Sequence, residues 1–179
     1  MAGRIEIRFG GSGGQGVVLA ARILGEAAVL DGKNVLQTQA YGAEARGSLT
    51  KSEVIISDGK IGFPAVRDLD LLVTMSQEAA NSLVKGLKET GRLIVDSSNV
   101  THVPETKAVI YMLPITETTK KKLGNGFYAN MVMLGALTRI TNVVTSESVE
   151  KAICESLAEK HTEINIKAFR EGLQLRPQS

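Results

Sequence analysis

Residues 5–21 read IEIRFGGSGGQGVVLAA, and this stretch demands more of the backbone than any other part of the chain. Apolar and charged residues alternate up to Phe9, which indicates a strand, and apolar residues at helical spacing over 17–28 indicate a helix. Five glycines lie in the turn between them, from Gly10 to Gly16. Glycine has no Cβ and tolerates positive φ, so the turn can present bare amide N–H groups to a ligand. Because the positive end of the helix points at the same place, the turn predicts a cradle for phosphate or another anion.

Gly11, Gly13 and Gly16 have the G-x-G-x-x-G spacing of dinucleotide-binding folds, in the strand–turn–helix context that this motif requires. A nicotinamide-binding fold also places an acidic residue about twenty positions further on, at the end of the second strand. Asp31 has this spacing, but it belongs to a helix-end signal because Gly32 follows it. We therefore rank NAD or FAD binding low. The alternative that the glycines only let strand and helix pack closely stays open.

Length and composition indicate one globular domain over residues 1–179, with 43% hydrophobic residues and a formal net charge of +2. Basic and acidic residues are interleaved and aromatic residues are few, so we expect no nucleic-acid partner. Charges interrupt the first strand and no apolar run approaches membrane-spanning length. We therefore expect a cytoplasmic protein with no membrane partner.

Cysteine and histidine give no sign of a metal site in this chain. Cys154 is the single cysteine, and it cannot build a disulfide, a structural zinc site or an iron–sulfur cluster within the chain. In its helical segment it is expected to be a small buried hydrophobe. His102 and His161 stand far apart without ligand-like neighbours, so we assign no metal-binding and no catalytic residue to this chain.

Strand and helix signals alternate along the sequence. Further strands are expected at 34–38, 52–57, 69–75, 92–96 and 108–113, and helices at 17–30, 77–88, 116–123, 130–140, 146–160 and 163–173. The nearly continuous apolar run at 69–75 is typical of a strand that is buried on both faces. Ser76 and Ser146 have the character of N-caps. The pattern predicts an α/β fold, a Rossmann-like, mostly parallel sheet with helices on both faces and a helical C-terminal tail.

The loop expected at 39–50 holds a second candidate site. It carries Tyr41, Glu44 and Arg46 at the carboxyl end of a strand beside the glycine turn, where ligands of open α/β sheets bind. Arg46 could fork onto a phosphate or carboxylate, and Glu44 could orient it. From composition alone, an ordinary surface loop with an internal Glu–Arg pair is an equally good interpretation.

Two motifs taken together resemble the gamma subunit of 2-oxoacid:ferredoxin oxidoreductases. They are Gly11-Ser12-Gly13-Gly14-Gln15-Gly16-Val17 and Tyr41-Gly42-Ala43-Glu44-Ala45-Arg46-Gly47. The likeness continues over essentially the whole chain, in 53–57, 70–73, Asn130-Met131 with Leu134-Gly135, and 165–169 with Gly172. Size and the single cysteine are most similar to the stand-alone gamma subunit of the 2-oxoglutarate branch. The pyruvate and branched-chain 2-oxoacid enzymes and the indolepyruvate oxidoreductase beta chain are also similar.

The resemblance implies an enzyme that decarboxylates a 2-oxoacid on thiamine diphosphate, sends electrons through iron–sulfur clusters to ferredoxin and passes the acyl group to coenzyme A. It places thiamine diphosphate, magnesium and the clusters on alpha, beta and delta partner subunits, so this chain is not catalytic alone. The residues expected to contact a cofactor are Gly11, Gly13, Gly14, Gln15, Gly16, Tyr41, Glu44 and Arg46.

Three hypotheses about these residues remain. In the first, the glycine turn and Arg46 lie near the path of coenzyme A and steady its pyrophosphate. In the second, the turn and the loop that begins at Tyr41 form the interface with the thiamine-binding chains. In the third, of another class, the chain is an independent nucleotide-binding module.

Overall fold

The computed structural model describes residues 3–41 and 48–177, and of Tyr41 only the backbone. Its centre is a six-stranded sheet in the order β2-β3-β1-β4-β5-β6. The strands are β1 (Arg4–Ser12), β2 (Asn34–Tyr41), β3 (Leu49–Ser57), β4 (Leu69–Thr74), β5 (Leu87–Asp96) and β6 (Val109–Leu113). β4 lies parallel to β1, β5 to β4 and β6 to β5, whereas β3 is antiparallel to both β1 and β2. The expected α/β fold is confirmed, and its mostly parallel sheet has an antiparallel pair of strands at one edge.

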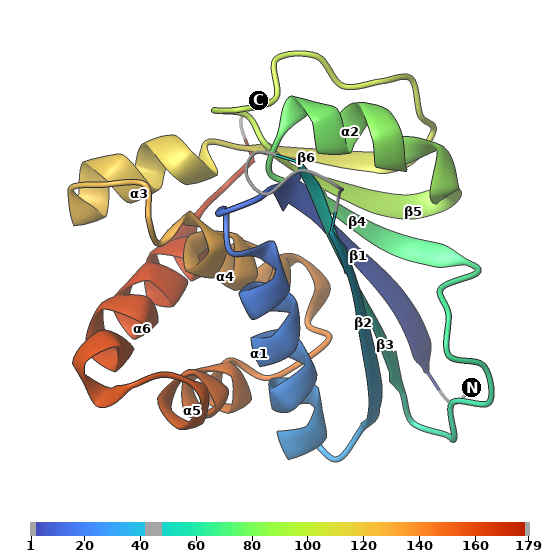
Figure 1. Cartoon of the computed structure of the whole chain (residues 1–179), viewed down its shortest axis with the longest axis horizontal. Coiled ribbons are helices and arrows are strands. Elements are labelled where there is room, and N and C mark those ends of the chain that lie inside the picture. The colour runs from blue at the N-terminus through green and yellow to red at the C-terminus, as the bar shows by residue number, and fades with distance from the viewer. Residues whose placement is uncertain (1–2, 42–47, 178–179) are drawn as a thin grey trace.

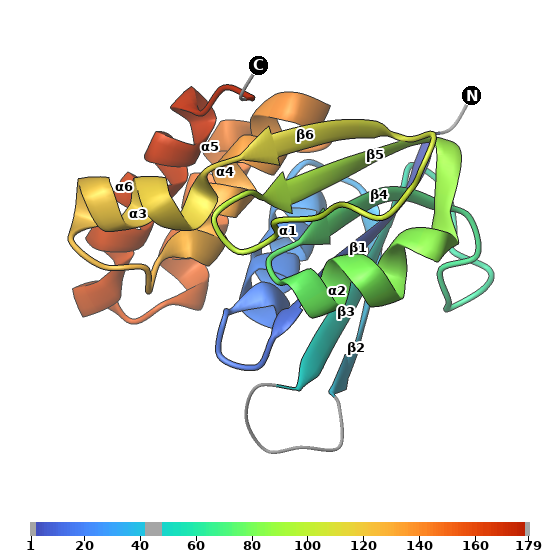
Figure 2. The ribbon, with the colours of Figure 1, turned by 90° about the horizontal axis from the view of Figure 1, so that it is seen from above.

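Helices cover both faces of this sheet (Figures 1 and 2). They are α1 (Val17–Leu30), α2 (Gln77–Leu83), α3 (Ile115–Leu123), α4 (Ala129–Thr141), α5 (Ser146–Ser156) and α6 (Glu159–Gln174). α1 and α4 lie on one face, where α5 packs against α1 and α6 against α4. α2 covers the opposite face, and the 3₁₀ turn η1 (Val84–Gly86) leads from it into β5. The helical C-terminal tail is thus confirmed, and most of it shares one face with α1.

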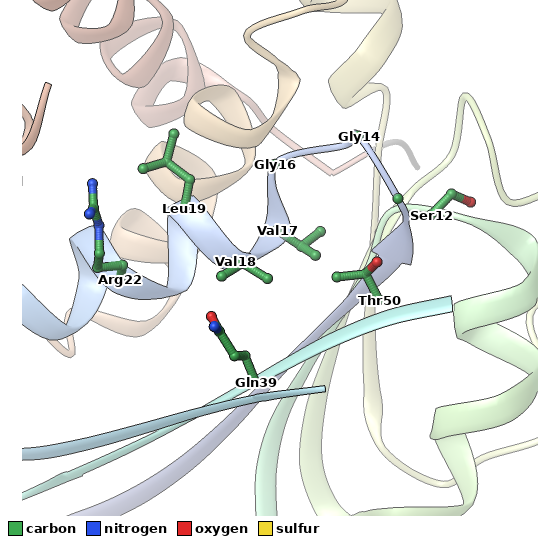
Figure 3. Close-up of a pocket in the computed structure, with 10 residues that line it drawn as sticks. Ser12, Gly14, Gly16, Val17, Val18, Leu19, Arg22, Gln39 and Thr50 are labelled. Atoms are coloured by element: carbon green, nitrogen blue, oxygen red, sulfur yellow. The ribbon is translucent and has the colours of Figure 1, made fainter. Parts of the chain in front are cut away.

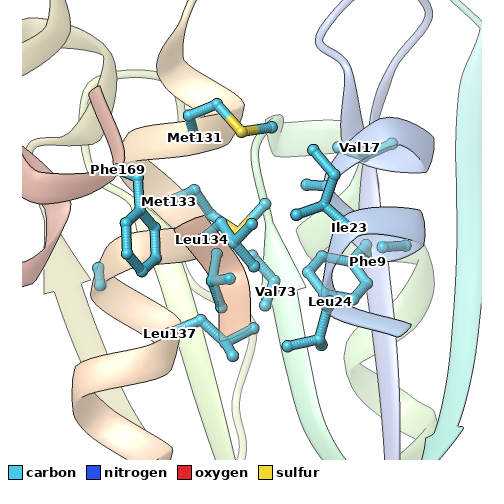
Figure 4. Close-up of a cluster of buried hydrophobic side chains, with 14 of the residues drawn as sticks. Phe9, Val17, Ile23, Leu24, Val73, Met131, Met133, Leu134, Leu137 and Phe169 are labelled. Atoms are coloured by element: carbon cyan, nitrogen blue, oxygen red, sulfur yellow. The ribbon is translucent and has the colours of Figure 1, made fainter. Parts of the chain in front are cut away.

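Two hydrophobic cores fill the space between helices and sheet. Side chains from β1, β4, α1, α4 and α6 meet in the larger core (Figure 4). In β4, Leu71 and Val73 belong to this core, whereas Leu72 belongs to the smaller core beneath α2. All three side chains are at most 1% exposed. The prediction that this strand is buried on both faces is confirmed.

Several predicted boundaries were wrong because pairing between distant residues decided them. The helix expected to run to residue 88 ends at Leu83, and β5 begins at Leu87 rather than at 92. Leu87 pairs with Leu69 of β4, and Lys88 Nζ lies 2.7 Å from Asp70 Oδ1, so strand pairing overrides the helical pattern. β2 and β3 extend further than expected because the whole of β2 pairs with residues 50–57 of β3. The last helix begins at residue 159 rather than 163.

Two local predictions about α5 are corrected, whereas the predicted cap of α2 is confirmed. Thr145, not Ser146, caps α5, and its Oγ1 accepts a hydrogen bond from the Ser148 N–H at 3.2 Å. Cys154 is exposed rather than buried, because it lies outside the buried face of α5. The Ser76 hydroxyl accepts a hydrogen bond from the Ala79 N–H at 3.3 Å, as expected of an N-cap.

Glu6 ties β1 to the loop before β4. Its side chain is buried, and its carboxylate accepts hydrogen bonds from the backbone N–H groups of Arg67 at 2.6 Å and Asp68 at 2.9 Å. Arg4 Nε donates a third at 2.8 Å. Burial by itself raises the pKa of Glu6, but the hydrogen bonds from Asp68, Arg4 and Arg67 outweigh burial, and the net pKa is lowered.

We expect Glu6→Gln to lower the free energy of unfolding by about 1.5 kcal/mol at neutral pH, because a neutral amide accepts these bonds less strongly. A lowered folded-state pKa means that the carboxylate stabilises the fold fully above its unfolded pKa. This contribution is lost as the pH falls through the lower folded value. Urea unfolding of both proteins should therefore give a difference that shrinks below about pH 4. A difference that stays constant from neutral to acidic pH would contradict this account of Glu6.

Candidate functional site

The glycine turn between β1 and α1 is held to the carboxyl end of the sheet by the Gln15 side chain. Gln15 Oε1 accepts a hydrogen bond from the Ser12 N–H at 2.7 Å, and Gln15 Nε2 donates to the Met75 carbonyl at 2.8 Å. Met75 directly follows β4, the parallel neighbour of β1. The Gln15 side chain therefore braces the turn, so a ligand there would meet the backbone of the turn rather than this amide.

The glycines of the turn fall into two groups. A Cβ at Gly11 would lie 2.7 Å from Gln15 Oε1 and 2.9 Å from Val17 Cγ1, and one at Gly16 would lie 2.5 Å from Asn130 Nδ2. At these two positions the packing interpretation holds. Gly14 differs, because its φ is +96°, which by itself favours glycine, and no atom of the described residues lies within 4 Å of an added Cβ. Backbone conformation rather than packing accounts for Gly14, and as far as the described residues go its surface is open to a ligand.

No side chain of the described residues caps the N-terminus of α1, which follows the turn. The N-cap residue is Gly16, with φ of 72°, and the first turn of the helix contains no acidic residue. Asn130 of α4 donates from Nδ2 to the Gly16 carbonyl at 3.2 Å and fixes this helix end in place. An uncapped helix N-terminus combines free amide donors with the positive end of the helix dipole, so this end suits an anionic group.

A groove of about 1000 Å³ opens beside the turn (Figure 3). One wall is the start of α1, and the other is the paired ends of β2 and β3. The Gly13 N–H donates to the Ser48 carbonyl at 3.0 Å, which joins the two walls. The described lining residues are Ser12, Gly13, Gly14, Gly16, Val17, Val18, Leu19, Arg22, Gln39 and Thr50. Arg22 is the single charged residue among them, so this part of the lining offers no carboxylate to repel an anion.

The candidate residues from the sequence are only partly described. The groove brings the glycine turn together with Gln39 of β2, a strand whose last residue is Tyr41. Glu44 and Arg46 lie outside the described residues, so their roles stay predictions. Sequence reasoning placed Gln39 and Thr50 at the ends of the candidate loop and gave them no role, because both strands were predicted to be too short. It also missed Arg22, whose place two turns into α1 carries no motif signal.

Asp31, which has the sequence spacing of a ribose-binding acid, serves another purpose. It caps the end of α1, with Gly32 at φ of +77°, as the helix-end signal predicts. Its carboxylate accepts hydrogen bonds from the Thr145 N–H at 2.7 Å and from the Ser148 hydroxyl at 2.5 Å. Burial raises the pKa of Asp31, but the bonds from Ser148 and Thr145 and the charge of Lys33 lower it further than burial raises it. Asp31 thus fastens α1 to α5, away from the groove.

The described part of the chain offers no ligand set for a metal ion or an iron–sulfur cluster. No three His, Cys, Asp or Glu side chains gather there as metal ligands. Cys154 is a free, exposed thiol. Within the same residues, none of the helices has the length and apolar character needed to cross a membrane.

Comparison with protein-family models assigns residues 6–175 to the family described as pyruvate ferredoxin/flavodoxin oxidoreductase. The chain belongs to this family. The 2-oxoglutarate synthase subunit KorC of Methanocaldococcus jannaschii is 46% identical over 175 residues, which are 96% of this chain and 94% of the relative. The pyruvate synthase subunit PorC of the same organism is 34% identical, covering 92% of each chain. A subunit of a 2-oxoglutarate synthase and a subunit of a pyruvate synthase are therefore both similar to this chain.

Solved structures agree with this assignment. The gamma subunit of a keto/oxoacid ferredoxin oxidoreductase from Geobacter sulfurreducens has a TM-score of 0.87 and 44% identity, covering 97% of this chain and 96% of that one. The 2-oxoglutarate:ferredoxin oxidoreductase of Magnetococcus marinus, solved with 2-oxoglutarate, coenzyme A and succinyl-CoA bound, has a TM-score of 0.85. It is 22% identical, and the match spans 95% of this chain and 30% of that longer chain, so it shows a shared fold. The resemblance to gamma subunits of 2-oxoacid:ferredoxin oxidoreductases is confirmed.

Proposed function

We propose that this chain is the gamma subunit of a 2-oxoglutarate:ferredoxin oxidoreductase. Such an enzyme decarboxylates the 2-oxoacid, transfers two electrons to ferredoxin and passes the acyl group to coenzyme A. The observation that carries the choice of substrate is a difference in identity. Four relatives named 2-oxoglutarate synthase subunit KorC are 37–46% identical to the chain, whereas relatives named for pyruvate or ketoisovalerate enzymes are 29–34% identical.

In this proposal, the chemistry of decarboxylation and electron transfer belongs to partner subunits. Thiamine diphosphate with its magnesium supplies the carbanion chemistry there, and iron–sulfur clusters carry the electrons. The partners are the alpha, beta and delta subunits of the same complex. The single cysteine of the sequence cannot hold an iron–sulfur cluster within this chain, which supports this division of labour.

The chain's own contribution is contact with coenzyme A at the glycine turn. The pyrophosphate of coenzyme A lies against the open surface of Gly14 and the uncapped N-terminus of α1. The guanidinium of Arg46 adds a positive charge and donates two parallel hydrogen bonds to the pyrophosphate. The apolar side chains of Val18 and Leu19 border the same groove and suit the aliphatic parts of the molecule. A groove without described carboxylates supports an anionic ligand.

The rival scaffold hypothesis keeps one specific observation in its favour. The bond from Gly13 to Ser48 makes the turn and the neighbouring strand ends a single continuous surface. Such a surface also suits contact with a thiamine-binding subunit. In that case, changes at the turn will break assembly before they affect the use of coenzyme A.

A gentle pull-down of the tagged chain from its native host tests the proposal. We expect larger thiamine- and cluster-containing chains to co-purify, and the eluate to reduce a viologen dye in a coenzyme A-dependent reaction. The rate should be at least about tenfold higher with 2-oxoglutarate than with pyruvate or arylpyruvates. An intact Arg46→Ala complex with impaired use of coenzyme A will support contact over scaffolding. A chain that comes out alone and binds a nucleotide will overturn the proposal in favour of an independent module.

A further inference from the structure

We propose that the turn between α3 and α4, with Phe127 at its tip and lysines beside it, docks onto another chain of the same enzyme complex. That chain must offer an apolar pocket for Phe127 and carboxylates around it. The inference rests on the proposed function, because it takes the partner from the complex to which this chain is assigned. α3 lies at the margin of the molecule, beyond the end of β6 (Figures 1 and 2).

Phe127 is the most exposed large hydrophobic side chain in the described part of the protein. It is 80% exposed, whereas the next, Val29, is 59% exposed. A helix connection can use a polar residue at such a position without loss, so the fold of this chain does not explain the phenylalanine. Large aromatic side chains that are seated in a partner's pocket dominate the energy of many protein interfaces.

The turn holds Phe127 in a defined position. The Phe127 N–H donates to Asn125 Oδ1 at 2.9 Å, and the ring meets Tyr128 edge-on with 5.3 Å between centroids. At the end of α3, the Gly124 N–H donates a hydrogen bond to the Lys120 carbonyl at 2.9 Å. At the start of α4, the Ala129 N–H donates one to the Gly126 carbonyl at 3.2 Å. A projecting aromatic ring on a hydrogen-bonded turn loses little freedom on binding, which favours association.

Lysines precede the turn that carries Phe127, and they indicate the chemistry of the partner. The last turn of α3 carries Lys120, Lys121 and Lys122, and the stem of Lys120 lies 3.5 Å from the position of a Cβ on Gly126. Lys122 pairs with Glu171 at 3.8 Å, but across residues 3–41 and 48–177 neither Lys120 nor Lys121 joins an ion pair. Lysines at a helix C-terminus also favour the helix dipole, which accounts for their charge but not for Phe127. An apolar centre with a cationic rim fits an acidic partner surface.

This surface connects directly to the candidate site. α4 begins two residues after Phe127, and its Asn130 bonds the Gly16 carbonyl at the N-terminus of α1. A partner that covers Phe127 therefore contacts the segment that leads directly into the helix holding this bond.

The test compares Phe127→Ala and the double charge reversal K120E/K121E with Phe63→Ala in the pull-down from the native host. Phe63 is also an exposed phenylalanine, at 43%, but it lies between β3 and β4 over Arg67. We expect Phe127→Ala to reduce the amount of co-purified partner chains about tenfold and Phe63→Ala to leave it unchanged. K120E/K121E should also reduce the amount of co-purified partner chains, and this amount should depend less on salt than it does for wild type.

Each outcome decides the matter. The proposal is wrong if Phe127→Ala recovers as much of the partner chains as wild type does. It is also wrong if Phe127→Ala and Phe63→Ala reduce the amount of partner chains equally. Self-association of the purified chain that depends on Phe127 would assign the surface to a second copy and overturn it too. If the wild-type chain itself recovers no thiamine- or cluster-containing partner, the proposed function fails, a result distinct from one that arises only in the variants. Thermal unfolding of each variant must match wild type, since both phenylalanine side chains are exposed.

Discussion

We expect Gly172→Ala to lower the free energy of unfolding by about 3 kcal/mol or more and Tm by roughly 6–12 °C. Helices α4 and α6 touch backbone to backbone where Gly135 and Gly172 face each other. A Cβ at Gly172 would collide with the Val132 carbonyl, with the Ala136 nitrogen only 3.0 Å away. A Cβ at Gly135 would collide with the Phe169 carbonyl. Because backbone atoms cannot turn aside as a side chain does, the helices must move apart, and the core around Phe169 loses its close packing.

Gly62→Ala is the matched control, since no described atom lies within 4 Å of its added Cβ and its φ is not in the left-handed region. We expect this change to stay within about 0.5 kcal/mol of wild type in the same urea or thermal unfolding experiment. The double variant with Gly135→Ala should cost less than the sum of the two single changes, because one separation of the helices relieves both collisions. A single change at Gly172 as mild as the control would show that the two helices are not locked at this crossing.

The contact between α4 and α6 matters to the candidate site as well as to stability. α4 carries Asn130, whose amide holds the Gly16 carbonyl at the start of α1. If α4 shifts away from α6, that bond and the position of the uncapped helix end shift with it. The sensitive glycines therefore support the glycine turn from the opposite side of α4.

The fold class could be predicted because its signals are local. Each segment shows its own pattern: residues alternate up to Phe9, glycines follow, and the helix from Val17 is apolar. The run of β4 is apolar throughout, so it indicates a buried strand without knowledge of its neighbours. The start of β5 could not be predicted, since Lys88 becomes part of a strand only through Leu69 and Asp70 of β4. The antiparallel placement of β2 and β3 is likewise a property of their pairing rather than of either segment.

The candidate site was predictable as a place but not in its detail. The glycine pattern locates the turn, and the turn does lie at the carboxyl end of β1. Its glycines look alike in the sequence, however, and only the fold separates them. Gly16 is confined by Asn130, which stands 114 positions away, whereas in the described part of the chain Gly14 has no neighbour within 4 Å of an added Cβ. Gln15 was predicted to contact a cofactor, but its side-chain amide is hydrogen-bonded to the backbone of Ser12 and Met75. No sequence pattern indicates these two bonds.

That difference between the glycines allows the coenzyme A contact to be tested by charge alone. Asn and Asp tolerate positive φ better than other residues with a Cβ, so Gly14→Asn and Gly14→Asp share a shape and a backbone cost. They differ by one negative charge beside the N-terminus of α1. We expect the assembled Gly14→Asp enzyme to have a KM for coenzyme A about 30-fold above that of Gly14→Asn, or roughly 2 kcal/mol. KM for the 2-oxoacid should be the same in both, as should the yield of partner chains.

Measuring the salt dependence of KM and the yield of partner chains distinguishes the two hypotheses, contact of the turn with coenzyme A and contact with a partner subunit. If the added carboxylate repels the pyrophosphate, the ratio of the two KM values must shrink as ionic strength rises, since the charges lie at an open groove within reach of counterions. A scaffold predicts the opposite pattern, in which both variants lose partner chains to a similar degree and any surviving complex uses coenzyme A normally. Equal KM values in two fully assembled variants would remove coenzyme A from the glycine turn. The positive φ of Gly14 would then be the whole reason for glycine at this position.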